Sequence, residues 1–508
     1  MSSSRTKKSV RNLFFTLFTQ ITNLIMKFVG RTIFIRVLGV ELLGISGLFT
    51  NILTLLSLAE LGFGNAVIYS MYKPLKENDE QKLAALTTFY KKIYRIIICI
   101  IIIVGLAFLP FIDSLVNLDN PIKYLRLYYL LFLLDTVSTY VYCYKQSILN
   151  ANQEMYITKI VFSMVQLFQF IFQIIVIVLT KNYMLYLIIQ VLCTLLNNII
   201  CSFIADKKYP FLKIKNELSI QEKKEILSNV RSLFLYKISG TVLNNTDNIF
   251  ISILIGTTVV GYYSNYFMVT NAINGIIYLI FTSITASVGN LMVEKDLKKK
   301  NDVFLQLNLL CFVLTGGASI ILFGVLNDFV SLWIGPEFVI SINVVYITIV
   351  NFFIYDMQIP VWIYRDTTGL FNDAKNATIV LAICNIILSY ILGIKLGLFG
   401  ILLATALSRL FITSWQQPYV LYKKILKTSP KRFFTNSLYY ILIFIISLFP
   451  CLYVSKIFIV NNLLALIIKT FCIGAITVVV FFIFLFNTRE FKELKSRFLS
   501  IFKKNDQL

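Results

Sequence analysis

The sequence has 508 residues, of which 58% are hydrophobic and 14% are charged, and its formal net charge is +22. Soluble domains carry about 25% charged residues, so this composition excludes an ordinary soluble enzyme and indicates an integral membrane protein. The chain has no histidine and no GxxxxGK[ST] loop, which excludes histidine metal sites and transport driven by its own ATP hydrolysis. We expect no catalytic residue, no metal and no cofactor, and we expect that the protein is not an enzyme.

Fourteen apolar segments are each long enough to cross about 30 Å of hydrocarbon as a helix that rises 1.5 Å per residue. The predicted fold is therefore an all-α integral membrane protein with about fourteen transmembrane helices. The predicted helices are 12–38, 44–72, 83–113, 122–150, 155–180, 182–205, 229–255, 259–293, 303–332, 338–365, 372–395, 398–425, 431–455 and 460–487.

The basic residues are distributed unevenly over this topology. With the N-terminus inside, most of the 47 Lys and Arg fall on inner loops, helix ends and tails. Those on the outer side are Lys123, Arg126, Lys181, Lys395 and Lys456. By the positive-inside rule this asymmetry places both termini in the cytoplasm, and it explains the basic charge without nucleic acid. We expect a monomeric, multi-pass protein of a bacterial cytoplasmic membrane, in contact with phospholipid.

The first predicted helix carries a polar face inside the membrane. Lys27 and Arg31 lie on this face, at helical spacing from Asn23. A charge at bilayer depth costs about 2.5–3.5 kcal/mol on insertion scales, so it normally faces a bundle interior or a wet cavity. The second helix adds Glu60. Cations beside a carboxylate at this depth predict a polar chamber rather than a passive span.

A short internal repeat separates the chain into two halves. Residues 33–35 with Gly39 and Gly44 resemble residues 249–251 with Gly256 and Gly261. Six predicted helices separate the copies, so both halves enter the membrane in the same direction, and such repeats form two lobes with the substrate site between them. The predicted organisation is an N-terminal six-helix lobe (1–205), a cytoplasmic basic linker (206–228), a C-terminal six-helix lobe (229–428), and two extra transmembrane helices with a basic cytoplasmic tail (429–508).

Polar residues inside predicted helices of both halves are the candidates for a transport site. The candidate substrate-binding or translocation residues are Lys27, Arg31, Glu60, Asp135, Lys237, Asn244, Asp247, Asn265 and Arg409. Lys145 and Arg365 lie near the inner ends of their helices, where we expect gating or topological contacts. Lys469, in the last helix, is expected to snorkel or to meet lipid.

Several stretches of the sequence resemble a known family. They are GRTIFIRVLGVELLGISGLFTNILTLLSLAELGFGNAVIYSMYKPL (30–75), YCYKQSILNANQEMYI (142–157), NNTDNIFIS (244–252), YRDTTGLFNDAKN (364–376) and 385–418, which ends in Trp-x-x-Pro. Together they resemble the Wzx-type polysaccharide flippases of the multidrug/oligosaccharidyl-lipid/polysaccharide (MOP) superfamily. The resemblance covers nearly the whole chain, from residue 12 to about residue 486.

The resemblance implies a fold and a substrate. The fold would be a MATE/MurJ-like pair of pseudo-symmetric six-helix lobes that work by alternating access, and the two added helices would offer a groove for a polyprenyl tail. The substrate would be an undecaprenyl-diphosphate-linked oligosaccharide repeat unit, moved from the inner to the outer leaflet for capsule or O-antigen synthesis. Its partners would be this lipid-linked oligosaccharide and a polysaccharide polymerase with chain-length machinery.

The chemistry of the candidate residues agrees with that substrate. Guanidinium and ammonium groups bind diphosphate oxygens, and amide faces suit sugar hydroxyls. A carboxylate that takes up H⁺ or Na⁺ would couple transport to an ion gradient. The alternatives are a cation-coupled multidrug exporter of the same fold, a flippase for lipid II or a teichoic-type precursor, and a membrane glycosyltransferase or polymerase, for which the outer loops are too short.

Overall fold

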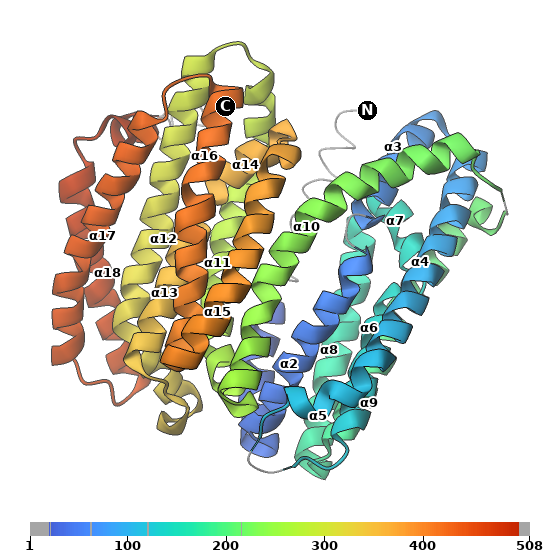
Figure 1. The fold of residues 1–508 in the computed structure, drawn as a ribbon, viewed down its shortest axis with the longest axis horizontal. Helices are drawn as coiled ribbons and strands as arrows, with labels where there is room; N and C mark the ends of the chain where they lie inside the picture. Colours follow the sequence, from blue (N-terminus) through green and yellow to red (C-terminus); the bar gives the residue numbers. More distant parts are fainter. Residues whose placement is uncertain (1–19, 21, 61–62, 119–120, 215, 497–508) are drawn as a thin grey trace, which may run out of the picture. The chain divides into compact units, whose positions relative to one another are not determined.

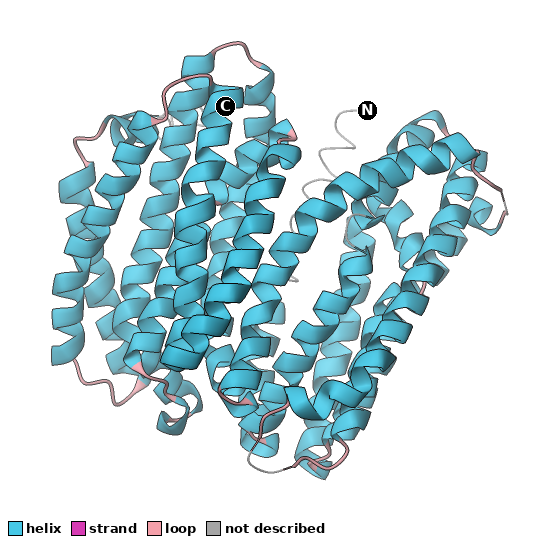
Figure 2. Cartoon of the chain, viewed as in Figure 1, coloured by secondary structure: helices cyan, strands magenta, loops and turns pink. Residues whose placement is uncertain are grey.

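The structure is a computed structural model that describes residues 20, 22–60, 63–118, 121–214 and 216–496. Within these ranges the chain is helical and has no β-strand (Figure 2). The predicted all-α class is therefore confirmed. The chain divides into two compact units, an N-terminal unit (Met1–Gly261) and a C-terminal unit (Tyr262–Leu508).

The N-terminal unit begins with a helix over 22–38, which precedes the first labelled helix of Figure 1. The elements that follow are α2 (Val40–Leu56), η1 (Ser57–Glu60), α3 (Phe63–Glu77), α4 (Glu80–Phe108), η2 (Leu109–Phe111), α5 (Ile112–Leu115), α6 (Leu125–Tyr140), α7 (Cys143–Ala151), α8 (Met155–Thr180), α9 (Tyr183–Lys208), η3 (Pro210–Lys213) and α10 (Ile220–Leu254). α11 (Thr257–Val293) starts in this unit and continues into the next.

The C-terminal unit holds the rest of α11 and the remaining helices (Figure 1). These are α12 (Leu297–Ile334), η4 (Pro336–Phe338), α13 (Ile342–Asp356), α14 (Ile359–Thr368), α15 (Phe371–Ser408), the π-helix η5 (Arg409–Thr413), α16 (Ser414–Leu421), the π-helix η6 (Tyr422–Leu426), α17 (Lys431–Ile457) and α18 (Leu463–Leu485).

Nine helices in the described part of the chain are long and apolar enough to cross a membrane. Others are interrupted, and each interrupted pair matches one predicted span: α2 with α3, and α6 with α7. Conversely, α15 contains a kink at Gly397 (φ 61°, ψ −140°) that divides it into two helices. Counted in this way, the elements agree with about fourteen predicted helices.

The seventh predicted helix begins earlier than its hydropathy indicates. α10 starts at Ile220 and runs unbroken to Leu254, so residues 220–228 of the predicted linker are continuous with it. Ser219 accepts a hydrogen bond from the backbone N–H of Glu222, and the Glu222 side chain accepts one from the backbone N–H of Ser219. This capping box satisfies two otherwise unpaired donors at the start of the helix.

The breaks in two helices are explained by specific residues. Between α6 and α7, Val141 is extended and Tyr142 is left-handed (φ 61°). The Nδ2 group of buried Asn198 donates to the Ser138 and Thr139 carbonyl oxygens at 2.8 and 3.1 Å, so the end of α6 is not left unpaired. Between α13 and α14, Pro360 has no N–H to continue the helix.

The two copies of the sequence repeat pack against each other. Gly39 and Gly256 both have positive φ, 86° and 148°, and each precedes the first residue of a helix, α2 and α11. A Cβ atom at Gly261 would lie 2.5 Å from the Val40 carbonyl oxygen, and one at Gly44 would collide with the carbonyl of Thr257. The contact is reciprocal, because each glycine faces the carbonyl four residues before the other. Side chains are therefore excluded from this crossing.

The last two helices are fixed to α12 by an ion pair whose lysine is buried. Lys469 is 2% exposed, and its Nζ lies 2.7 Å from Asp328 Oδ2 and 3.0 Å from the Ser455 carbonyl oxygen. The expectation that Lys469 snorkels or meets lipid is therefore wrong. The acidic partner on α12 lies well over 100 residues away in the sequence, so helical spacing could not reveal it. Phe312 of α12, stacked on the Phe481 ring at 4.9 Å, extends the same interface.

Candidate functional site

A polar cluster lies inside the N-terminal unit around Asp135. This carboxylate accepts hydrogen bonds from Gln190 Nε2 at 2.6 Å and from Thr194 Oγ1 at 2.7 Å. α9 positions both donors, since residues four apart lie on one face of a helix. Each carboxylate oxygen thus has a neutral donor, which offsets part of the cost of taking a carboxylate out of water.

Arg31 enters this cluster from the helix 22–38. It interacts electrostatically with Tyr186, which also interacts with Asp135. Tyr186 lies one helical turn before Gln190 on α9, and its ring packs edge-on against Phe34 with centroids 5.4 Å apart. The structure therefore brings together two predicted residues, Arg31 and Asp135, through a tyrosine.

A row of hydrogen-bonded glutamines on α8 extends to Tyr186, next to the cluster around Asp135. Gln166 donates to Gln169 at 3.3 Å, Gln169 donates to Gln173 at 3.4 Å, and Gln173 donates to the Tyr186 carbonyl oxygen at 3.1 Å. These side chains share one face because they are three and four residues apart. The row gives this unit amide donors and acceptors beside its arginine.

Glu60 lies apart from this cluster, in the 3-10 turn that ends α2. It interacts electrostatically with Tyr94, Tyr140 and Cys143. The Tyr94 and Tyr140 rings stack with centroids 6.4 Å apart. Glu60 is therefore placed where the break after α2 meets the break between α6 and α7.

A second polar cluster lies inside the C-terminal unit around Arg409. The guanidinium group lies over the Tyr355 ring, 4.8 Å from its centroid, and interacts electrostatically with Asp356. Arg409 begins a π-helix, a distortion that is frequent at functional sites. Asp356 is fully buried and accepts a hydrogen bond from Asn274 Nδ2 at 2.5 Å.

The structure also places the remaining candidates. Lys27 is exposed on the helix 22–38, and Asp247 is partly buried on α10. Asn265 is fully buried on α11. Lys237 and Asn244 belong to α10, but their side chains lie outside the described part of the structure.

The two inner-end candidates are both paired with a neighbouring acid. Lys145 Nζ lies 2.6 Å from Asp206 Oδ2, and Arg365 lies 2.8 Å from Asp366 Oδ1. Lys145 follows the break of α6 and α7, and Arg365 follows the break of α13 and α14. The two cations therefore occupy matching places in the two halves.

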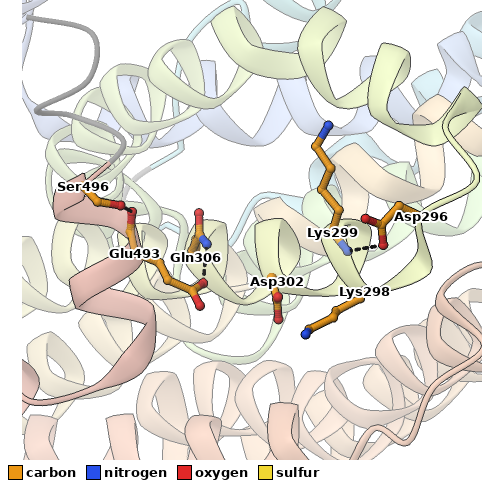
Figure 3. Close-up of a pocket in the computed structure, with 7 residues that line it drawn as sticks. All are labelled: Asp296, Lys298, Lys299, Asp302, Gln306, Glu493 and Ser496. Atoms are coloured by element: carbon orange, nitrogen blue, oxygen red, sulfur yellow. Dashed lines mark hydrogen bonds between the residues drawn. The ribbon is translucent and has the colours of Figure 1, made fainter. Parts of the chain in front are cut away.

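A pocket of about 280 Å³ lies at the start of α12 (Figure 3). It is lined by Asp296, Lys298, Lys299, Asp302, Gln306, Glu493 and Ser496. Its acids have structural partners: Asp296 caps α12, Asp302 accepts from Arg489, and Glu493 accepts from Arg489 and Gln306. Burial raises the pKa of Glu493, but these hydrogen bonds outweigh burial and hold it below its ordinary value. The hydrogen bonds around this pocket connect the segment after α18 to α12.

Comparison with protein-family profiles assigns the chain to a family. The profile of the family described as "Polysaccharide biosynthesis protein" matches residues 9–285, which is more than half of the sequence. The chain belongs to this family. No curated relative matches the chain in sequence.

Solved structures show the fold of this family member. A structure described as "Lipid II flippase MurJ, inward closed conformation" matches with a TM-score of 0.69 and 16% identity, over 94% of this chain and 98% of that one. An inward-facing multidrug resistance MATE family transporter of the MOP superfamily matches with a TM-score of 0.64 and 15% identity, over 81% and 96%. A mutant form of the Vibrio cholerae MATE transporter VcmN gives 0.57 and 12%, over 84% and 98%. The chain is a multi-pass membrane protein with the fold of MOP-superfamily transporters.

The two clusters of this family member have the same chemical composition. Each unit holds an arginine, a tyrosine and a carboxylate, and each carboxylate accepts a hydrogen bond from an amide side chain. Sequence reasoning found Arg31, Asp135 and Arg409 but missed Asp356. The signal for Asp356 was present, because it is an acidic residue inside a predicted span and four residues before a proline.

Proposed function

We propose that this protein is a flippase that moves undecaprenyl-diphosphate-linked oligosaccharide repeat units from the inner to the outer leaflet of a bacterial cytoplasmic membrane. The product would supply capsule, O-antigen or another surface polysaccharide. The observation that carries the proposal is the pair of matching clusters, each with an arginine inside a predicted membrane helix beside a carboxylate and an amide. The family membership supports it.

The chemistry of the arginines supports a diphosphate as the recognised group. A guanidinium group presents five N–H donors in a fork that fits phosphate oxygens, and it keeps its charge at any physiological pH. Both oxygens of Asp135 accept hydrogen bonds from neutral groups, the side chains of Gln190 and Thr194. The amides of α8 and α9 would bind sugar hydroxyls.

We further propose that transport follows alternating access and is coupled to an ion gradient of H⁺ or Na⁺. A coupling ion changes which conformation is favoured only if it binds the two conformations with different affinity. Asp247, Glu60 and Asp135 are the carboxylates proposed for that role, because each lies within or at the end of a predicted membrane helix.

The proposal is tested by genetic complementation in a strain that lacks the chromosomal copy. Arg31→Ala and Asp247→Ala are expected to abolish surface polysaccharide while the protein remains at normal level in the membrane. Arg36→Ala is the matched control, since Arg36 is exposed on the same helix as Arg31. Normal polysaccharide in both variants would remove the site assignment, and loss of dye resistance with normal polysaccharide would favour a multidrug exporter.

A further inference from the structure

Asp356 is a buried carboxylate in the C-terminal unit. It is 0% exposed, at the C-terminal end of α13. Its Oδ1 atom accepts from Asn274 Nδ2, whereas its Oδ2 atom has no hydrogen-bond partner among the described residues. An ionised oxygen that is buried without a partner is costly. The group is therefore sensitive to any change of charge around it.

The break in the helix explains why Asp356 is held in this place. Pro360, four residues further on, cannot donate to the Asp356 carbonyl oxygen as a helical N–H would. The Cys311 thiol of α12 donates to that oxygen instead, at 3.1 Å. Asn274 on α11 holds the side chain. Backbone and carboxylate are thus fixed from two different helices.

The charged and titratable groups around Asp356 come from five elements. Arg409 of η5 and the Cys311 thiol of α12 interact with it electrostatically, and Tyr355 is its neighbour on α13. Beyond Tyr355 lie Tyr278 of α11 and Arg365 of α14. Arg409 is the cation whose charge acts directly on Asp356.

A diphosphate bound at Arg409 would change the balance between the ionised and the protonated form of Asp356. The cation now favours the ionised form of Asp356, because opposite charges attract. A diphosphate would bring two negative charges to the same guanidinium and would repel a carboxylate in a medium of low dielectric constant. The carboxylate escapes that repulsion by accepting a proton on Oδ2. Thermodynamic linkage makes the effect reciprocal, so a protonated Asp356 strengthens diphosphate binding.

We propose that Asp356 takes up one proton when the diphosphate of the substrate binds at Arg409. The inference rests on the proposed function, and it assigns to the C-terminal unit a site that binds a proton together with the substrate. A proton suits this carboxylate, because an N–H donor already occupies Oδ1 and leaves Oδ2 to accept it. The proton comes from the aqueous buffer: one bond to hydrogen breaks in the buffer acid and one O–H bond forms at Oδ2.

The test uses the purified full-length chain in lipid nanodiscs and a short-chain prenyl-diphospho-N-acetylglucosamine as the probe. The phosphates of this diester do not titrate near neutral pH, so any proton taken up comes from the protein. Titration calorimetry in two buffers of different ionisation enthalpy measures the number of protons bound with the probe. Wild type is expected to take up protons, and binding is expected to weaken as pH rises.

Two variants decide the result. Asp356→Asn is expected to bind the probe without proton uptake, with an affinity at neutral pH higher by on the order of tenfold, the usual size of a coupling between two sites. Asp373→Asn is the control, because Asp373 is paired with Lys424 at 2.5 Å in the same unit; it is expected to behave as wild type. Proton uptake that persists unchanged in Asp356→Asn would overturn the proposal.

A second measurement separates this inference from the proposed function. Infrared difference spectra, recorded without probe over a range of pH, are expected to show a protonated-carboxyl band that Asp356→Asn removes and Arg409→Gln alters. If the band behaves in this way and the probe does not bind, diphosphate recognition at Arg409 is wrong but the coupling of the two side chains stands. Spectra of Asp356→Asn identical to wild type would refute the coupling itself.

Discussion

The close crossing of α2 and α11 leaves no room for a side chain at Gly261. A Cβ atom added there would lie 2.5 Å from the Val40 carbonyl oxygen, 2.7 Å from Val40 Cγ2 and 3.2 Å from the Gly44 nitrogen. A carbon–oxygen contact between helices is normally about 3.3–3.6 Å, so the helices must separate by roughly 0.8 Å. Gly261→Ala should therefore destabilise the protein.

The size of the loss follows from what the separation disturbs. Overpacking of a well-packed interface costs about 1–3 kcal/mol. The first turn of α11 is also fixed by Thr257, whose N–H donates to the Asn117 carbonyl oxygen at 2.8 Å and whose hydroxyl accepts from the Asn117 N–H at 2.9 Å. Movement of α11 strains both bonds, so we expect a loss near 3 kcal/mol, about the upper end of that range.

Equilibrium unfolding in mixed micelles measures this loss. Gly44→Ala, at the repeat-related position, should behave as Gly261→Ala does. Gly47→Ala is the matched control, because its Cβ would lie 3.4 Å from Val260 Cγ1, an ordinary contact, and its stability should stay within about 0.5 kcal/mol of wild type. A Gly261→Ala protein as stable as the Gly47→Ala control would show that the close crossing does not exist.

Two further variants test the polar contacts that hold the helices. Lys469→Met leaves the Asp328 carboxylate and the Ser455 carbonyl without their donor. It should cost about 3 kcal/mol, the low end for a broken buried pair, because the Asp328 side chain is 33% exposed. Adding Asp328→Asn should restore most of the stability in the same unfolding assay, and equal losses in the single and double variants would contradict the ion pair. Asn198→Ala removes the donor to the last carbonyls of α6 and should cost about 1–3 kcal/mol. Hydrogen exchange should then rise first around the α6–α7 break, and a rise spread evenly over the unit would contradict the assigned role.

Local sequence patterns predicted most of the fold. Apolar length predicted about fourteen helices, and the repeat located two glycines, Gly39 and Gly256, that both have positive φ angles in the structure. Hydropathy alone did not locate interruptions inside spans. The break at Val141–Tyr142 depends on Asn198 of another helix, and the sequence of α6 contains no proline or glycine there to indicate it.

The candidate site was predicted less completely than the fold. Helical spacing identified which side chains share a face on one helix, and so it found Arg31 and Asp135 separately. It could not show that α9 supplies the donors Gln190 and Thr194 to Asp135, because neutral polar residues carry no insertion penalty large enough to attract notice. The error at Lys469 has the same origin, since its acidic partner lies on a helix far away in the sequence.

The most direct test of the central claim is the leaflet in which the lipid-linked repeat unit accumulates. Spheroplasts of a strain that lacks the protein, complemented with wild type or with Arg31→Ala, would be treated with a membrane-impermeant enzyme that cleaves the diphosphate-linked sugar. We predict that the repeat unit is cleaved with wild type and protected with Arg31→Ala or without the protein. Equal cleavage in all three strains would contradict the claim, because the lipid-linked sugar would then cross the membrane without this protein.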